Sequence, residues 1–490
     1  MKKPTTIAHR LAAIALSLTL AIPSPVRADD YRLPEIGAPA DNLLTPLQEK
    51  RLGQAFMRYV RTSNQVIEDP LLADYIQKLG HTLVQKGVDS GGDFHFFLVD
   101  DDQVNAFAGP GGHIGVYTGL VLTTQSESEL AAVLAHEIAH VTQHHLKRAW
   151  QDSGSLGLVQ GAALLAAIVL GATLGGDAGI AAAMGVQAAL AQHQINFTRS
   201  NEQEADRVGI QILDRAGFDP RAMPTFFGRM GRVNDDSGTQ VPEFLRTHPV
   251  TNARIADSLA RAEQLPYRQH ADSLDYLLTR ARLRERSFHD PAAAVRHFRA
   301  VLDQHRYRSR AAARYGLTLA LLRAGRLDEA AREADELLRD HPKILQFIVA
   351  AARIDMERGR GQAAIGRLRR AAARFPFSRP LQTILAEMEL RAGRPQDALD
   401  RLQALVETAP GEPRLHRLLA QALAATGHSA ESHHQLALAH YLRGDLESAR
   451  LQLRIALRQA RSDRFERARA EAELARVEAE LEALKKEKRR

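Results

Sequence analysis

Cysteine is absent from this chain of 490 residues, which excludes disulfide bonds, thiolate nucleophiles and metal sites built on sulfur. Any metal ion must therefore be held by histidine, aspartate or glutamate. Aromatic residues are also scarce, since they make up 5% of the sequence and include one tryptophan. Alanine, leucine and arginine are abundant instead, and this mixture favours helices. The composition predicts a mainly helical protein that is long enough for about two or three domains.

The net charge of +7 hides an asymmetry between the two halves of the chain. Residues 271–490 contain 42 Lys and Arg against 30 Asp and Glu, a net charge of +12. Residues 29–270 contain 19 against 28, a net charge of −9. This division predicts two domains with different tasks. Nucleic acid is not expected as a partner, because the basic residues alternate with acidic ones along the helices and form no stripe.

The first 28 residues have the pattern of a secretory signal peptide. Basic residues precede an apolar run over Leu11–Ile22, prolines follow it, and Val26-Arg27-Ala28 fits a cleavage site before Asp29. The alternative is a short anchor helix, which is disfavoured because the run is shorter than the roughly 20 residues that span a bilayer. No cysteine follows the site to carry a lipid anchor. We therefore expect export to a bacterial periplasm, with cleavage after Ala28.

The second half carries an internal repeat of 34 residues on three separate tracks. Glycines, prolines and alanines each recur at this step: Gly325, Gly359, Gly393 and Gly427; Pro342, Pro376 and Pro410; Ala330, Ala364 and Ala398. This is the period of tetratricopeptide repeats, in which glycine ends the first helix, alanine permits close packing and proline ends the second helix. We therefore expect an α-solenoid over residues 271–490, with a charged capping helix from Asp463 to Arg490.

Residues 29–270 have the pattern of an α+β domain. Helices are predicted near Pro46–Val60 and Leu71–Gln85, followed by a strand over Phe94–Val99. A second strand over His113–Tyr117 can pair with Val104–Ala108 across a turn rich in glycine.

An apolar stretch over residues 155–191 is rich in alanine and glycine. The part over Leu156–Leu174 is long enough to span a bilayer, but Gly175-Gly176-Asp177 can turn the segment back on itself. We favour a buried or interfacial helical hairpin, with contact to a membrane surface, over a true membrane span.

An HExxH motif is the sharpest chemical signal in the sequence. It consists of His136, Glu137 and His140, inside a helix that a capping box opens at residues 126–129 and that we expect to reach about Trp150. Four residues make about one helical turn, so both imidazoles leave the same face and can share a zinc ion. Glu137 lies beside them and can take a proton from water at the metal.

A catalytic zinc ion needs a third protein ligand, which should come from another element. Glu202 and Asp206 lie four residues apart in a predicted amphipathic helix and therefore share a face. Glu202 can bind the metal, while Asp206 can support a ligand or act at the scissile bond. The alternative is an acidic first turn that the helix dipole favours. Glu204 points to another side and, like His144 and His145 after the motif, is expected at the surface.

Together, HEIAH at 136–140, NEQEADRVG at 201–209 and Thr247-His248-Pro249 with Arg254 resemble the zinc metallopeptidases related to HtpX and Oma. The signal peptide, the segment VNAFAGPGGHIGVYTGL at 104–120 and the repeats look most similar to the periplasmic BepA-type members of that family. The resemblance covers nearly the whole mature chain.

This resemblance implies a minigluzincin-like catalytic domain, endopeptidase activity and a role in the assembly and quality control of outer-membrane proteins. It implies one zinc ion per chain, with His136, His140 and Glu202 as ligands, Glu137 as the catalytic base and Asp206 as the proton donor. The implied partners are unfolded or misassembled outer-membrane proteins and, through the repeats, the outer-membrane assembly machinery.

Two further features each have two interpretations. Asn105, Ala106 and Phe107 can present a strand edge to an extended peptide substrate, or can belong to a purely structural hairpin. His248 can occupy the open zinc position and keep the enzyme latent, or can be an ordinary loop histidine.

Three functions fit these features. The first is a periplasmic zinc endopeptidase with a tetratricopeptide platform for its clients. The second is an assembly chaperone whose protease site is latent. The third is a scaffold with a structural metal, which the HExxH motif disfavours because a structural zinc ion needs no glutamate base.

Overall fold

The computed structural model describes residues 45–63, 66–89, 92–152, 199–236, 243–460 and 463–488. The expected signal peptide at 1–28 and the apolar stretch at 155–191 lie outside these residues. Within the described residues, no helix is both long and apolar enough to cross a membrane.

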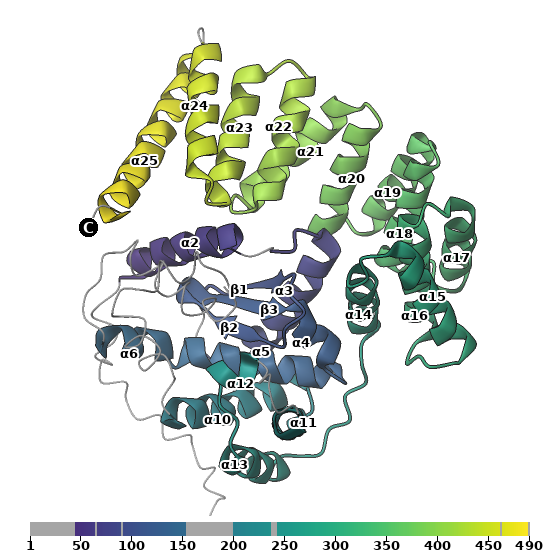
Figure 1. Ribbon diagram of the computed structural model, residues 1–490. Coiled ribbons are helices and arrows are strands. Elements are labelled where there is room, and N and C mark those ends of the chain that lie inside the picture. Colours follow the sequence, from purple (N-terminus) through teal and green to yellow (C-terminus); the bar gives the residue numbers. More distant parts are fainter. Residues whose placement is uncertain are drawn as a thin grey trace, which may run out of the picture. The chain divides into compact units, whose positions relative to one another are not determined.

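The first part of the chain combines helices with one small sheet (Figure 1). Its elements are α2 (Pro46–Ser63), α3 (Pro70–Gly87), β1 (His95–Val99), β2 (Ala106–Ala108), the 3₁₀ turn η2 (Pro110–Gly112), β3 (His113–Tyr117), α4 (Thr118–Thr123), α5 (Glu127–Thr142), α6 (His145–Asp152), α10 (Arg199–Ala216), α11 (Ala222–Asp236), α12 (Glu243–Thr247) and α13 (Asn252–Glu263). Helix α3 packs against β1, and α5 packs against β2 and β3.

The sheet has the strand order β1-β3-β2, so β2 lies at its edge. β3 pairs in parallel with β1, which places His113 opposite His95, and antiparallel with β2, which places Val116 opposite Ala106. The predicted pairing between 104–108 and 113–117 is confirmed.

Helix α5, which carries the HExxH motif, is buried along almost its whole length. Its N-cap is Ser126, whose hydroxyl accepts a hydrogen bond from the Glu129 amide at 3.2 Å, as the capping box predicts. Every residue from Glu127 to His140 is buried. The prediction that this helix continues to Trp150 is wrong, because α5 ends at Thr142 and a residue with positive φ separates it from α6.

The second part of the chain is a series of helices, coloured from teal to yellow in Figure 1. They are α14 (Leu274–Arg286), α15 (Pro291–Asp303), α16 (Arg310–Arg323), α17 (Leu327–Asp340), α18 (Leu345–Glu357), α19 (Gly361–Arg374), α20 (Arg379–Arg391), α21 (Pro395–Thr408), α22 (Pro413–Ala425), α23 (Ser429–Leu442), α24 (Leu446–Gln459) and α25 (Arg464–Lys488).

Glycine ends the first helix of successive repeats, as the sequence predicts. Gly325 and Gly359 have φ values of 71° and 74°, in the left-handed region that glycine adopts without strain. After Gly359, the Arg360 amide donates to the Asp355 carbonyl at 2.8 Å, which closes the Schellman turn. Ala364, five residues after Gly359, is fully buried where two helices meet. The 34-residue solenoid is therefore confirmed.

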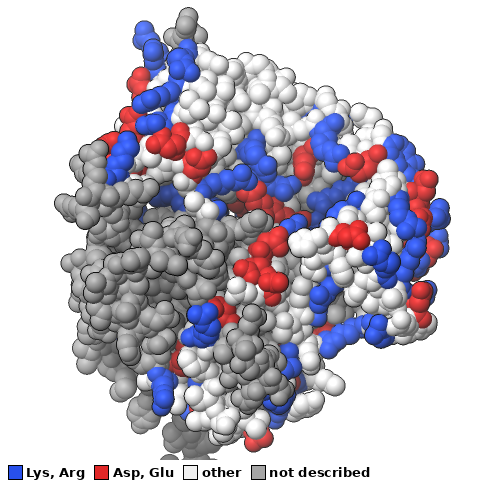
Figure 2. Space-filling view, viewed as in Figure 1, with Lys and Arg blue, Asp and Glu red and all other residues white. Residues whose placement is uncertain are grey.

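Charges of both signs are mixed over the repeat helices on the face that Figure 2 shows. Several ion pairs join neighbouring repeats, among them Arg391 with Glu357 at 2.8 Å and Arg299 with Glu329 at 2.6 Å. Exposed pairs of this kind each add little stability, roughly 0–1 kcal/mol. They do, however, place much of the positive charge of this half next to carboxylates.

The loop before α3 is paired with arginines of the repeat helices. Arg282 of α14 binds the Asp69 carboxylate, and Arg443 binds Glu68 at 2.7 Å. Burial acts to raise the pKa of Asp69, but the charges of Arg282 and Arg353 together with the hydrogen bonds to this carboxylate outweigh it and lower that pKa to about 2. Tyr276 of α14 also lies in the core around the sheet. A domain boundary at residue 270 stays a prediction, because α14 belongs to both packing environments.

Candidate active site and metal centre

The two histidines of the HExxH motif face the same point, one turn apart on α5. The Nε2 atoms of His136 and His140 lie 3.0 Å from each other, and both side chains are at most 1% exposed. The spacing in sequence predicts this arrangement, since residues four apart share a helix face.

Helix α10 brings a carboxylate to these two nitrogens. Glu202 places its Oε2 3.4 Å from Nε2 of His136 and its Oε1 3.5 Å from Nε2 of His140. Burial acts to raise the pKa of Glu202, but His248 and His136 outweigh it and hold that pKa well below its usual range. Glu202 is therefore an ionised oxygen donor, as expected for a metal ligand.

A third imidazole completes the cluster. His248 follows directly after α12 and places its Nδ1 3.3 Å from Nε2 of His136 and 3.0 Å from Oε1 of Glu202. Its other nitrogen, Nε2, lies 3.5 Å from Oε1 of Glu137. His248 is buried, although the sequence could not distinguish this position from that of an ordinary loop histidine.

The donor set fits a small divalent metal. One ligand atom from each of His136, His140, Glu202 and His248 lies within 4.8 Å of all the others, and all four side chains are buried. Ligands about 2.1 Å from a tetrahedral zinc ion lie about 3.4 Å apart, close to the separations given above. Imidazole and carboxylate donors are also the ones zinc takes when cysteine is missing.

Glu137 lies between this cluster and the sheet edge. Its carboxyl is buried, and burial raises its pKa above the usual range, although His248 and His136 act to lower it. The backbone of Ala108 in β2 donates a hydrogen bond to this carboxyl. A carboxyl with a raised pKa, next to a metal cluster, accepts a proton more readily than an ordinary glutamate, which is what a general base must do.

The edge strand directs part of its backbone toward Glu137. The carbonyl of Asn105 and the amide of Gly109 bond to β3, so the backbone groups of Ala106 and Ala108 point away from β3. The side chains of Asn105, Ala106 and Phe107 are buried. What β2 offers at this edge is therefore its main chain, which is the part that an added strand recognises.

The ring of His136 is fixed from behind by a buried ion pair. Asp206 Oδ1 lies 3.0 Å from His136 Nδ1, and Arg254 donates two hydrogen bonds of 2.8 Å to Asp206. Arg254 also lies 2.7 Å from Glu202. The sequence marks Arg254 as part of a motif but does not indicate these contacts, since nothing in the sequence connects α13 with α10.

The environment of Asp206 favours one of the two roles that the sequence leaves open for it. Burial acts to raise its pKa, but the hydrogen bonds from Arg254 and His136 outweigh burial and lower it. An ionised carboxylate accepts hydrogen bonds only, so these contacts favour support of the ligand His136. The role of proton donor, which the resemblance implies, stays a prediction.

The two HExxH histidines have opposite electrostatic environments. Burial acts to lower the pKa of His136, but its hydrogen bonds to Asp206 and Glu202 raise it to about 9. Burial and the neighbouring His136 lower the pKa of His140 well below the usual range. The carboxylates thus concentrate on the His136 side of the cluster.

Two residues expected at the surface lie behind the other histidine. His145 is fully buried and touches His140, and Glu204 touches His145. The expectation for His145 is therefore wrong, because the break after α5 turns the chain back toward the motif, whereas the side chain of Glu204 stays 27% exposed. No glycine or proline in the sequence signals this break.

Known proteins match both parts of the chain. Peptidase family M48 matches residues 70–262, and tetratricopeptide repeats match residues 283–343 and 355–422. The chain is 37% identical to the beta-barrel assembly-enhancing protease of Yersinia pestis over 397 residues, and these residues make up 81% of each of the two chains. It is 34% identical to the protein of the same name from Escherichia coli (strain K12) over 468 residues, and these residues make up 95% of each of the two chains.

A more distant relative matches only the first part. The mitochondrial metalloendopeptidase OMA1 of Arabidopsis thaliana is 26% identical over 216 residues, which make up 44% of this chain and 41% of that one. All four residues of the metal cluster lie inside the region that matches peptidase family M48.

Proposed function

The chain belongs to the beta-barrel assembly-enhancing proteases of peptidase family M48, and we propose that it is a periplasmic zinc endopeptidase acting in the assembly and quality control of outer-membrane proteins. One observation carries the proposal: Glu137 lies beside a buried cluster of His136, His140, Glu202 and His248. The family implies a metal, and this donor set supports zinc, one ion per chain.

The proposed roles follow from the contacts of each residue. His136, His140 and Glu202 would hold the zinc ion, which when bound polarises a peptide carbonyl and makes water more acidic. Glu137 accepts the proton of the attacking water and passes it to the leaving amine, since it lies next to the cluster with a raised pKa. Asp206 keeps His136 in place, with Arg254 behind it.

A substrate peptide would extend the sheet at β2. The backbone groups of Ala106 and Ala108 point away from β3, which is the side where the main chain of an added strand would pair, and the Ala108 backbone already donates a hydrogen bond to the proposed base. Asn105, Ala106 and Phe107 therefore remain our candidates for the strand that binds substrate. Recognition through the main chain suits a protease whose clients share little sequence.

The location and partners are proposed from the sequence together with the family. Residues 1–28 would direct export and be removed after Ala28, leaving a metallopeptidase domain at 29–270 and a repeat domain at 271–490. The repeats mediate contacts with other proteins, and we propose unfolded outer-membrane proteins and their assembly machinery as partners.

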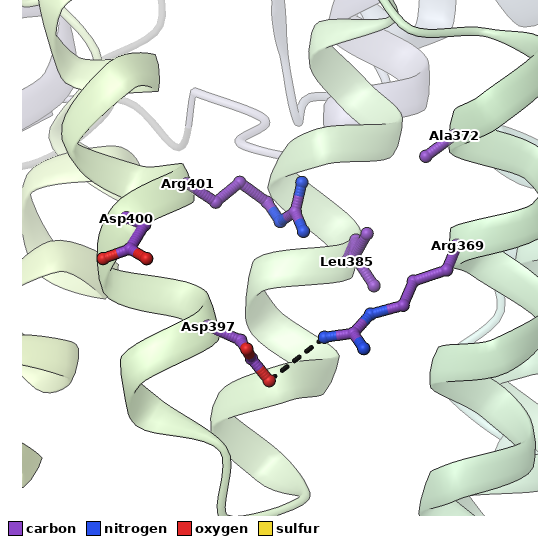
Figure 3. Close-up of a pocket in the computed structure, with 6 residues that line it drawn as sticks. All are labelled: Arg369, Ala372, Leu385, Asp397, Asp400 and Arg401. Carbon is purple, nitrogen blue, oxygen red and sulfur yellow. Dashed lines mark hydrogen bonds and ion pairs between the residues drawn. The ribbon is translucent and has the colours of Figure 1, made fainter.

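A pocket of about 450 Å³ between the repeat helices α19, α20 and α21 is lined in part by Arg369 and Arg401 (Figure 3). Both arginines are already paired with the buried Glu389, and Arg369 also with Asp397. The arginines that line the pocket therefore already have carboxylate partners, and we assign no client protein to the pocket.

Protease and chaperone predict different fates for a client. When the chain from Asp29 onward meets an unfolded outer-membrane β-barrel protein, we expect cleavage, and we expect the same barrel to resist cleavage once folded in detergent. Fragments resolved by gel electrophoresis and mass spectrometry are the measurement. A client that stays intact while its aggregation is suppressed would contradict the protease and support the chaperone.

His248 is proposed to restrain the enzyme. Its Nδ1 lies 3.3 Å from Nε2 of His136, close enough to the other donors to act as a fourth ligand, and in that role it would exclude the catalytic water. Replacing His248 with alanine should keep the zinc ion, because three ligands remain, and should raise turnover several-fold. The measurement is turnover of an unfolded client at equal zinc occupancy. An unchanged or lower rate would rule out the restraint.

A further inference from the structure

A chain of hydrogen-bonding groups runs from the metal cluster through a second histidine to a carboxylate. His145 Nδ1 lies 2.8 Å from His140 Nδ1, and His145 Nε2 lies 3.1 Å from Oε2 of Glu204. The side chain of His145 is fully buried, whereas that of Glu204 is 27% exposed. His140 thus touches the cluster with one ring nitrogen and His145 with the other.

The backbone is bent at the point that makes this contact. His144 has a φ of 54°, in the left-handed region that is uncommon for residues other than glycine. This single residue ends the run of α5 and lets His145 begin α6 directly behind His140. Arg148 of α6 then donates to Glu204 at 3.0 Å, which fixes the far end of the chain of contacts.

Helix α10 supplies carboxylates both to the metal cluster and to His145 behind it. Glu202 faces Nε2 of His140, and Glu204, two residues further on, faces His145. Residues two apart point to different sides of a helix. One helix therefore supplies a carboxylate to the cluster and another to the group behind it.

The chemistry of the groups determines which ring nitrogen of His140 and of His145 carries a proton. If His140 binds metal through Nε2, its neutral ring carries the proton on Nδ1 and must donate it to Nδ1 of His145. His145 then carries its own proton on Nε2 and donates it to Glu204, which as a carboxylate only accepts. One arrangement of protons satisfies both contacts.

We propose that His145 and Glu204 are positioning residues, which fix the ring orientation and the tautomer of His140 for metal binding. The inference rests on the ligand role of His140 proposed above. It gives His140 a support equivalent to that which Asp206 and Arg254 give to His136. Groups behind a metal ligand typically change metal affinity by about 10–100-fold when they are removed.

The test is the zinc affinity of the mature chain, measured by competition with a chromophoric chelator. His145→Leu removes the acceptor for His140 and should weaken zinc binding by about 10–100-fold. His145→Asn keeps an acceptor oxygen near the place of Nδ1 and should recover most of the affinity. Glu204→Gln should weaken zinc binding less than His145→Leu does. Because the Glu204 side chain is partly exposed, this variant tests the series of hydrogen bonds even if His145→Leu does not fold.

A control variant separates positioning from the packing of α6. Lys147 lies on the same helix and binds Glu49 of α2 at 2.9 Å, outside the chain of contacts. Lys147→Ala should leave zinc affinity unchanged. The proposal is overturned if His145→Leu and Glu204→Gln bind zinc as tightly as the unaltered chain, or if Lys147→Ala weakens binding as much as they do. If the unaltered chain itself binds no zinc, the proposed function fails together with this inference.

Discussion

Replacement of Glu137 by glutamine should reduce cleavage of an unfolded client by about 10²–10⁴-fold, the range that a general base contributes. Glutamine keeps the size and shape of the side chain and one acceptor oxygen, but it cannot take up a proton at neutral pH. Glu137 is not one of the four cluster residues, so the variant should keep its zinc ion. Turnover and zinc content should therefore be measured on the same preparation.

Thermal unfolding of Glu137→Gln provides the control, because a buried carboxyl with a raised pKa is not expected to stabilise the fold. An unchanged melting temperature together with lost turnover assigns the effect to chemistry. Full proteolysis by Glu137→Gln would remove this residue from the mechanism.

Loss of bound zinc is the expected result of replacing a proposed ligand. His136→Ala and Glu202→Ala should each fall from one zinc ion per chain to a small fraction and should lose proteolysis. Each change leaves only two of the three ligands that we propose to hold the ion, and His248, which we propose restrains the enzyme, is not expected to replace the missing one. Elemental analysis after gel filtration is the measurement.

His248→Ala is the matched control from the same cluster. It also removes an imidazole within 3.3 Å of His136, but it should keep its zinc ion. Equal zinc loss in all three variants would mean that His248 is a full ligand. Zinc retention in His136→Ala would contradict the proposed site.

Features that depend on local periodicity could be read from the sequence. The 34-residue step predicts the solenoid because each turn after Gly325 or Gly359 needs a positive φ, which glycine supplies. The spacing of His136 and His140 predicts a shared face because the helical period is fixed. Glu202 could be predicted as their partner because an acidic residue on a second helix was the missing donor.

Features that depend on distant contacts could not be read in the same way. Helical periodicity tells which side Glu204 takes on α10 but not that α6 covers that side. The break at His144 has no glycine or proline to mark it, so the helix was expected to continue and His145 to be exposed. Arg254 reaches Asp206 from a separate helix, 48 residues along the chain.

The proposed function requires that the cluster work as a metal-dependent protease site. The most direct test is cleavage of one unfolded outer-membrane β-barrel protein by the mature chain before chelation, after removal of metal, and after return of zinc. We expect cleavage to stop when the metal is removed and to recover when about one equivalent of zinc per chain is returned. Cleavage that continues at the same rate without metal would contradict a metal-dependent protease site.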